Sequence, residues 1–232
     1  MKIICIADLH GNLDVTVPEG DVLAIAGDII PPSISFGGLG DEVAADWILN
    51  DFKDWYNGQP VKDIIVVAGN HDTVLQNSKN KIWGLGNNPT DCEATPWHYL
   101  QDSSIIIDHV KFYGTPWQPW FYSWAFNLPQ GGDGELYFDK IPSDTDILIS
   151  HSPPYGKGDR VGNKNCGSIS LMENVKRVKP KLHIFGHIHV GSGFREEIKW
   201  DDGSSTYLAN VALVDQAYKI VHEPLIKEYD VL

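Results

Sequence analysis

Histidine, carboxylate and amide residues occur at short spacings in five stretches of this chain of 232 residues. A pair of hard or borderline divalent cations requires imidazole and oxygen ligands on rigid positions. A single Asp-x-His pair would be weak evidence, because such residues often only hydrogen-bond a turn, but the complete series indicates a metal centre. The five stretches are Asp8-Leu9-His10, Gly27-Asp28, Gly69-Asn70-His71-Asp72, Ser150-His151 and Gly186-His187-Ile188-His189.

Each polar stretch follows a short apolar run that is typical of a strand buried on both faces. Because α/β sheets place their ligands at the carboxyl ends of strands, we expect the five stretches to meet at one edge. The apolar runs are Lys2–Ala7, Val22–Ala26, Val61–Ala68, Asp146–Ser150 and Lys181–Phe185.

The remaining periodic segments predict helices and a second sheet. Asp41–Tyr56 has apolar residues at near-helical spacing, and Gly167–Val178 has Ser168 or Ser170 as an N-cap. Strands are expected over Ile105–Tyr113, Ser205–Val211 and Tyr218–His222. Together the elements predict an α/β fold, a four-layer α-β-β-α sandwich of two mixed sheets flanked by helices.

Composition restricts the class of partner. The formal net charge of −13 argues against a protein that binds long nucleic acid through clustered cations, and it favours small substrates. No run approaches the roughly 20 apolar residues of a membrane span, so neither a transmembrane helix nor a signal peptide is expected. The three cysteines, Cys5, Cys92 and Cys166, predict no disulfide framework, which favours the cytoplasm.

In this order, the five polar stretches resemble the motifs of the calcineurin-like metallophosphoesterases, and the resemblance spans almost the whole chain. It implies one domain of that family over residues 1–232. Further segments are similar to a small subgroup that contains the mammalian metallophosphoesterase-domain proteins and includes cyclic-nucleotide phosphodiesterases. Those segments are Gly114-Thr115-Pro116-Trp117, His151-Ser152-Pro153-Pro154 and Phe185–His189.

The resemblance also implies a set of ligands for two divalent metal ions. One ion would be bound by Asp8, His10, Asp28 and His189, and the other by Asp28, Asn70, His151 and His187, with Asp28 bridging. His71 would lie outside both coordination shells as the catalytic residue beside the substrate. Four imidazole ligands favour Mn, Fe, Zn, Co or Ni over Mg, with manganese our first choice.

Two such cations can clamp a phosphoryl group and lower the pKa of a bridging water. The predicted activity is hydrolysis of small phosphodiesters by a metal-bound hydroxide, with cyclic nucleotides as the leading class and His71 protonating the leaving group. The alternatives are a phosphomonoesterase and a weakly active nucleotide-binding protein. Ile29-Ile30-Pro31-Pro32 follows Gly27-Asp28 where protein Ser/Thr phosphatases carry Asp-Arg-Gly, which argues against phosphoprotein substrates.

Two loops supply candidate substrate contacts. Residues 115–134 are rich in aromatics, whose faces can stack on a nucleobase, although covering the core is the commoner role. Cations of the loop after His151 could hold a phosphate oxygen, although solvated loop charges are more common. From these loops we select Trp117, Lys157 and Arg160.

Overall fold

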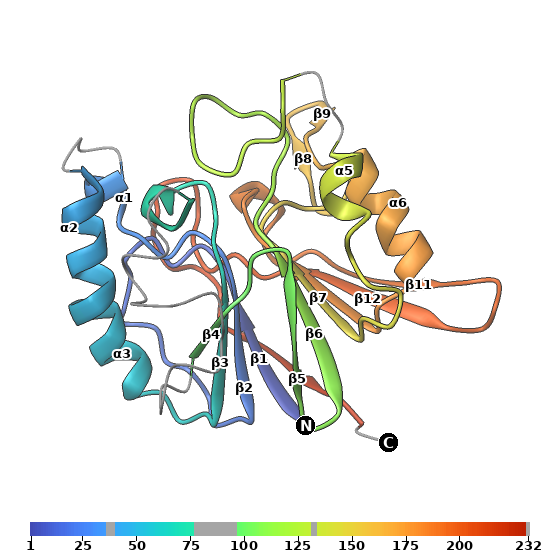
Figure 1. Ribbon diagram of the computed structural model, residues 1–232, viewed down its shortest axis with the longest axis horizontal. Helices are drawn as coiled ribbons and strands as arrows, with labels where there is room; N and C mark the ends of the chain where they lie inside the picture. Colours follow the sequence, from blue (N-terminus) through green and yellow to red (C-terminus); the bar gives the residue numbers. More distant parts are fainter. Residues whose placement is uncertain (36–39, 77–96, 131–133, 231–232) are drawn as a thin grey trace.

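A computed structural model of the chain describes residues 1–35, 40–76, 97–130 and 134–230. Two mixed sheets pack face to face, and helices cover the outer face of each sheet (Figure 1). The strand orders are β13-β1-β2-β3-β4 and β11-β12-β10-β7-β6-β5. The predicted four-layer α-β-β-α sandwich is confirmed.

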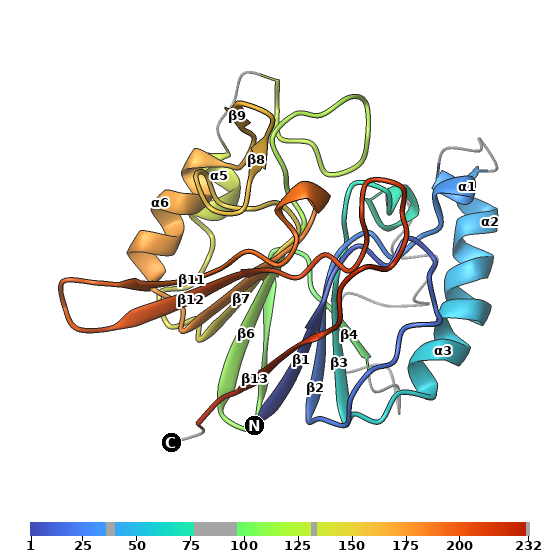
Figure 2. The same ribbon diagram turned by 180° about the vertical axis from the view of Figure 1, so that it is seen from behind.

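The first sheet contains β1 (Lys2–Ile6), β2 (Val22–Ala26), β3 (Asp63–Val67), β4 (Trp97–Tyr99) and β13 (Leu225–Glu228). Strands β1 to β4 run parallel, and β13 pairs antiparallel with β1 at the edge, as Figure 2 shows from behind. Successive side chains alternate between the two faces. Ile3 and Cys5 therefore enter the cluster between the sheets, whereas Ile4 and Ile6 face the helices.

The second sheet contains β5 (Ser103–Ile107), β6 (Val110–Thr115), β7 (Ile147–Ser150), β10 (Leu182–Phe185), β11 (Arg195–Lys199) and β12 (Ser205–Asn210). Strands β6, β7, β10 and β12 are parallel neighbours. Ile147 and Ile149 pack between the sheets, and Leu148 faces the helices on the other side.

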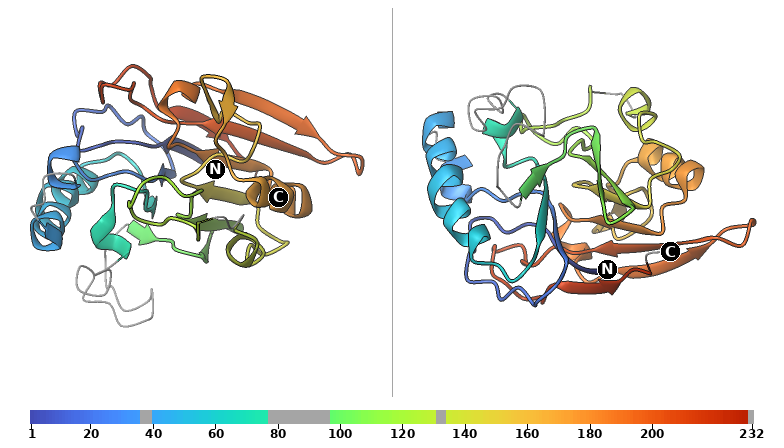
Figure 3. Two further views of the ribbon diagram at one scale, coloured as in Figure 1. Left: turned by 90° about the horizontal axis from the view of Figure 1, so that it is seen from above. Right: turned by 60° about the horizontal axis from the view of Figure 1, so that its bottom comes forward.

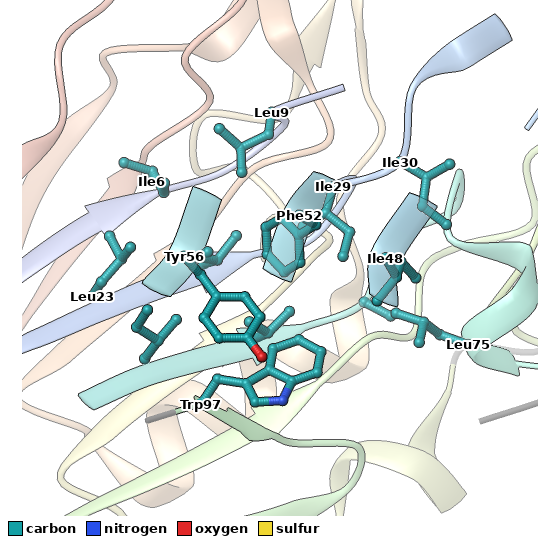
Figure 4. Packing of buried hydrophobic residues seen from close by; sticks show 14 of the residues in the cluster. Ile6, Leu9, Leu23, Ile29, Ile30, Ile48, Phe52, Tyr56, Leu75 and Trp97 are labelled. Atoms are coloured by element: carbon teal, nitrogen blue, oxygen red, sulfur yellow. The ribbon is translucent and has the colours of Figure 1, made fainter. Parts of the chain in front are cut away.

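Helices of the first half form a single covering layer with a wider turn in the middle. They are α1 (Pro32–Ser35), α2 (Gly40–Trp47), the π-helical turn η1 (Ile48–Phe52) and α3 (Lys53–Asn57), so the helix expected over Asp41–Tyr56 is confirmed. Phe52 and Tyr56 pack with Trp97 beneath this layer (Figure 4). Packing of these aromatic side chains stabilises the helix, because isolated helices of this length are only marginally stable in water.

The second half is covered by α5 (Glu135–Phe138) and α6 (Ile169–Val178). The Ser168 hydroxyl accepts the backbone N–H of Leu171 at 3.1 Å and caps α6, as its side-chain chemistry predicts. Short elements complete the fold: the hairpin of β8 (Arg160–Val161) and β9 (Lys164–Asn165), and the 3-10 turn η3 (His189–Gly191).

Two strand predictions were wrong. The run Ile105–Tyr113 is not one strand, because Asp108 and His109 adopt φ of 46° and 66° and turn the chain into the β5–β6 hairpin. A two-residue turn with both φ values positive matches the twist of a hairpin. Tyr218–His222 is not a strand, and its region has only an isolated bridge between Val214 and Ile220.

The two sheets are joined at the edge where their parallel strands end. Ala7, directly after β1, donates to the carbonyl of Val211 at 2.9 Å and accepts the N–H of Leu213 at 3.0 Å. The amino-terminus lies at the opposite end of the sheets (Figure 1), where the amino group of Met1 donates to Tyr229 O at 2.8 Å. Figure 3 shows the amino-terminal strand β1 beside β13 from two further directions. Among the described residues no helix is long and apolar enough to cross a membrane.

Candidate metal centre

The five polar stretches meet at the carboxyl ends of β1, β2, β3, β7 and β10, as the strand pattern predicts. Three overlapping groups of potential ligands have their donor atoms within 4.8 Å of one another. The groups are Asp8 with His10 and His189, His10 with Asp28 and His71, and Asp8 with Asp28 and His151. Segments more than a hundred residues apart in the sequence thus form one compact site.

One half of the site lies after β1. His10 Nε2 is 3.2 Å from His189 Nε2, and His189 Nε2 is 3.6 Å from Asp8 Oδ1. Asp28 Oδ2 lies 3.7 Å from His10 Nε2. These four side chains present their donor atoms to a common space that could hold one cation.

The other half lies between β3, β7 and β10. Asn70 Oδ1 is 2.9 Å from His151 Nε2 and 2.7 Å from His187 Nδ1. Asp28 Oδ2 is 3.5 Å from His151 Nε2, so this one carboxylate borders both halves. A bridging ligand for two cations would occupy such a position.

The tautomers of two histidines test whether a cation fits. His151 Nδ1 is 2.9 Å from the carbonyl of Ala26, and His189 Nδ1 is 3.0 Å from the carbonyl of Asp215. These nitrogens must carry the proton, because a carbonyl only accepts, and in the neutral ring Nε2 is then a bare lone pair. The lone pair of His151 faces Asn70 Oδ1, also an acceptor, and a cation between them removes the repulsion.

Burial shapes the charge state of the site. The pKa values of His10, His151 and His187 are lowered, first by burial, which disfavours the imidazolium. Burial and the neighbouring Asp8 charge raise the pKa of Asp28 well above its usual range. Burial lowers the pKa of His189 too, but its hydrogen bond with Asp8 and the Asp8 charge raise that pKa overall. Cations bind the neutral imidazole and the deprotonated carboxylate, so cations in this site would displace these protons and compensate the charges of Asp8 and Asp28.

The backbone conformation orients the proposed metal ligands. Asp8, His10, Asp28 and His187 all have left-handed φ, between 46° and 66°, which non-glycine residues seldom adopt. The backbone N–H of His187 donates to the Asp8 carboxylate at 3.0 Å, and the N–H of His71 donates to Asp28 Oδ1 at 2.8 Å. The carboxylates are therefore held by the turns of neighbouring strands.

Glycines beside the ligands have a steric role. A Cβ on Gly69 would lie 2.2 Å from Asp28 Oδ1, and one on Gly186 would lie 2.2 Å from Asp8 Oδ2. A Cβ on Gly27 would lie 2.3 Å from His151 Nδ1. Only glycine lets these carboxylates and this imidazole pack directly on the backbone.

His71 lies at the rim of the site, with its ring edge against His10 at 4.5 Å between centroids. Its Nδ1 is 3.1 Å from the Ser35 hydroxyl, and its Nε2 is 3.9 Å from Asp28 Oδ2. Burial, followed by the charge of His151, lowers the pKa of His71 to about 3, so the imidazole is neutral in the free protein near neutral pH.

Two supporting residues were not singled out from the sequence. Asp72 accepts backbone N–H bonds from Ile29, Ile30 and Gly69 at 2.7 to 3.0 Å and ties the turns after β2 and β3 together. Its place in Gly-Asn-His-Asp could have indicated this role. Tyr218 packs edge-on against His10 at 4.6 Å, and its loop carries no sequence signal for this contact.

A cavity of about 660 Å³ opens beside the donors, with Asp28, Asn70, His187 and His189 in its wall. The three candidate substrate contacts are not among its lining residues. Trp117 donates its indole N–H to Asp102 at 2.7 Å, Lys157 pairs with Glu196, and Arg160 donates to Gly162 O. The aromatic loop instead contributes Trp120, Phe121 and Trp124.

The chain matches the family model described as calcineurin-like phosphoesterase over residues 1–191. It is 35% identical over 244 residues to human metallophosphoesterase domain-containing protein 1, covering 97% of this chain and 70% of that protein. A UPF0046 protein of Caenorhabditis elegans is 32% identical over 233 residues, covering 97% of this chain and 74% of that protein.

Solved structures agree on the fold. One crystal structure aligns with a TM-score of 0.59 and 14% identity over 99% of both chains. The crystal structure of a Thermus thermophilus protein, TT1561, aligns with a TM-score of 0.54 and 12% identity over 97% of both chains. The chain belongs to the calcineurin-like phosphoesterase family, whose members are generally dinuclear metal hydrolases. The expected resemblance is thereby confirmed.

Proposed function

We propose that residues 1–232 form one domain that hydrolyses small phosphodiesters with two divalent cations, and that cyclic nucleotides are the leading substrate class. The observation that carries the proposal is the shared position of Asp28, whose Oδ2 lies 3.7 Å from His10 Nε2 and 3.5 Å from His151 Nε2. One cation would be held by Asp8, His10, Asp28 and His189, and the other by Asp28, Asn70, His151 and His187.

Two bound cations would supply Lewis-acid activation of the phosphoryl group and of a water molecule. The chain itself would then orient the substrate and manage a proton. His71 is the one imidazole at the rim that does not belong to the proposed ligand set, and its ring N–H can donate to a phosphate or leaving-group oxygen. A bound phosphate anion would raise its pKa and favour proton transfer to the departing alkoxide.

Diesters are favoured over monoesters because the cavity leaves room for organic groups on the phosphorus. Its volume of about 660 Å³ greatly exceeds that of a phosphate, and much of its wall is apolar. A monoester would contact this wall with one organic group, whereas a diester can place one group there while the other departs. Apolar walls with a few placed polar groups are what small-molecule sites use.

The proposed metal is manganese, with iron, zinc, cobalt and nickel as the other candidates, because four imidazoles exceed what magnesium accepts. The proposed location is the cytoplasm. Cys5 is buried and unpaired, and Cys166 is unpaired in the described structure, which suits a reducing compartment. Cys92 lies outside the described residues.

The test is to purify the chain without chelator, measure its metals by elemental analysis and assay four substrates. These are bis(p-nitrophenyl) phosphate, p-nitrophenyl phosphate, and the 2′,3′- and 3′,5′-cyclic nucleotides. We expect two cations per chain and turnover of the diesters ahead of the monoester. Full metal content with a flat response to every diester would overturn the proposal.

The role of His71 has its own test. The His71→Ala variant should retain both cations, because this residue is outside the proposed ligand set, and should lose about 10²- to 10⁴-fold in kcat on diesters with poor leaving groups. With p-nitrophenolate, which leaves without protonation, the loss should be much smaller. Equal turnover of wild type and variant on both kinds of substrate would refute the role.

A further inference from the structure

The part of the cavity wall that is not formed by the proposed ligands is largely apolar. Its residues come from three separate segments: the aromatic loop, the stretch from the end of β7 through the β8–β9 hairpin to the start of α6, and η3. The loop and the hairpin stand above the strand ends in Figure 1. The apolar residues are Trp120, Phe121, Tyr155, Val161, Ile169 and Val190, and all are at least 42% exposed. An apolar cluster of this kind marks an interaction site.

This apolar wall begins at the metal centre itself. The ring of Phe121 packs edge-on against that of His187, with centroids 5.9 Å apart. Ile188 and Val190 flank the proposed ligand His189 and line the same cavity. A group attached directly to a phosphorus atom between the cations would therefore reach the wall within a few bonds.

Lysine and arginine are absent from the lining of this cavity among the residues that the structure describes. Of the cations close to the lining residues in sequence, Lys157 Nζ is 2.5 Å from Glu196 Oε1 and Arg160 Nε donates to Gly162 O at 3.1 Å, while Lys164 and Lys219 are exposed and do not line the cavity. A second phosphate in this cavity would therefore have no lysine or arginine of the wall to compensate its charge, in a chain whose net charge is −13.

We propose that this cavity is the subsite for the retained ester group of the substrate, and that it selects flat apolar or aryl groups that carry no further phosphate. The inference rests on the proposed phosphodiesterase function and specifies its substrate class. It places nucleoside polyphosphates and bisphosphates outside the range of good substrates. Diesters with a single negative charge and an aromatic substituent lie inside it.

The first experiment compares two diesters with the same leaving group, methyl p-nitrophenyl phosphate and phenyl p-nitrophenyl phosphate. Each kcat/KM is divided by the rate of hydroxide-catalysed hydrolysis, which removes intrinsic reactivity. Burial of a phenyl group should favour the phenyl ester about 10- to 100-fold. A third diester with a phosphonate on the phenyl ring should lose this advantage.

A reversal of the selectivity supplies the second experiment. Ile169, at the start of α6, is 54% exposed, so Ile169→Arg should fold and place a cation at the cavity wall. The variant should lower kcat/KM for the phenyl ester and raise it for the phosphonate-bearing ester. Val161→Arg, at a position 42% exposed in β8, should do the same. The matched control is Ile106→Arg in β5, at a position 66% exposed, which should leave both values unchanged.

A binding measurement tests the subsite independently of catalytic turnover. Isothermal titration of the metal-loaded protein should give at least tenfold tighter binding of phenylphosphonate than of methylphosphonate, and Ile169→Arg should reduce the difference. Equal kcat/KM for the methyl and phenyl esters after division by the hydroxide rate, or arginine variants that behave like Ile106→Arg, would overturn the subsite and leave the phosphodiesterase standing. A protein with both cations that hydrolyses neither ester would overturn the phosphodiesterase, while tighter binding of phenylphosphonate would still support the subsite.

Discussion

The contact between Gly186 and Asp8 permits a sharp test of how precisely the ligands are held. In Gly186→Ala the new Cβ would lie 2.2 Å from Asp8 Oδ2 and 2.6 Å from the Cβ of Ala7. Ordinary contact begins at 3.4 Å, so the carboxylate must move by more than an ångström. Gly186 has no left-handed φ, and alanine therefore adds bulk there without adding backbone strain.

A displacement of the Asp8 carboxylate by this amount should weaken the binding of one cation far more than that of the other, because Asp8 belongs to only one of the two proposed ligand sets. Changes in residues that position ligands typically cost 10- to 100-fold in metal affinity. Misplacement by about 1 Å costs on the order of 100-fold in rate. After dialysis, elemental analysis of Gly186→Ala should give about one cation per chain, and kcat/KM on bis(p-nitrophenyl) phosphate should fall about 100-fold.

The control is Gly58→Ala, at the end of α3. Gly58 has a φ of −86°, and the nearest atom to its added Cβ is 3.4 Å away. This variant should keep both cations and full activity.

Crowding in Gly186→Ala should also lower the free energy of unfolding by about 1–3 kcal/mol, which urea denaturation of the metal-free protein measures. A folded Gly186→Ala that retains two cations and wild-type kcat/KM would refute the reasoning.

Two further predictions concern the metal-free protein. Burial lowers the pKa of His183 to about 3 from the 6.5 of an unfolded chain, so the unfolded state binds more protons below pH 6.5 and stability is lost as the pH falls toward 3. Between pH 7.5 and 5.5 the free energy of unfolding should fall by about 1.4 kcal/mol through this histidine. In urea unfolding, both His183→Asn and His183→Leu should show a pH dependence of stability that is smaller by that amount. An unchanged pH dependence in both variants would exclude His183 as its source. Asp72→Ala leaves three buried N–H groups without an acceptor, so it should lower the free energy of unfolding by about 3 kcal/mol in urea denaturation. The control Asp201→Ala changes an exposed residue and should lower it by less than about 0.5 kcal/mol. Similar losses in the two variants would contradict this account.

Strand positions could be predicted because the buried parallel strands are nearly continuous apolar runs. Each of the five apolar runs ends at a polar stretch, so the predicted ends of these strands also indicated where the site would lie. Val22–Ala26 was predicted to the residue. Strands at the sheet edges have no such signal: Arg195–Lys199 alternates exposed and half-buried residues and is rich in charge, so its sequence resembles a loop.

The site itself was only partly predictable. Spacing indicated which polar side chains would meet at the strand ends, because a complete series of carboxylates and imidazoles after five buried strands is hard to explain by turn structure alone. Their division between two cations came from the family resemblance and stays a prediction. The supporting contacts depend on tertiary structure. Tyr218 meets His10 because its loop is hydrogen-bonded to Ala7 and Asn12 in the stretch after β1, and Phe121 reaches His187 through the path of a long aromatic loop. The hairpin at Asp108 was missed because neither turn residue is glycine or asparagine.

The four left-handed residues of the site make its geometry depend on the rest of the fold. Each such conformation costs roughly 1 kcal/mol or more, which the packing and hydrogen bonds around these turns must offset. A substitution that loosens the packing beneath these turns, without touching any of the four side chains, would therefore also disturb the position of their carboxylates and imidazoles.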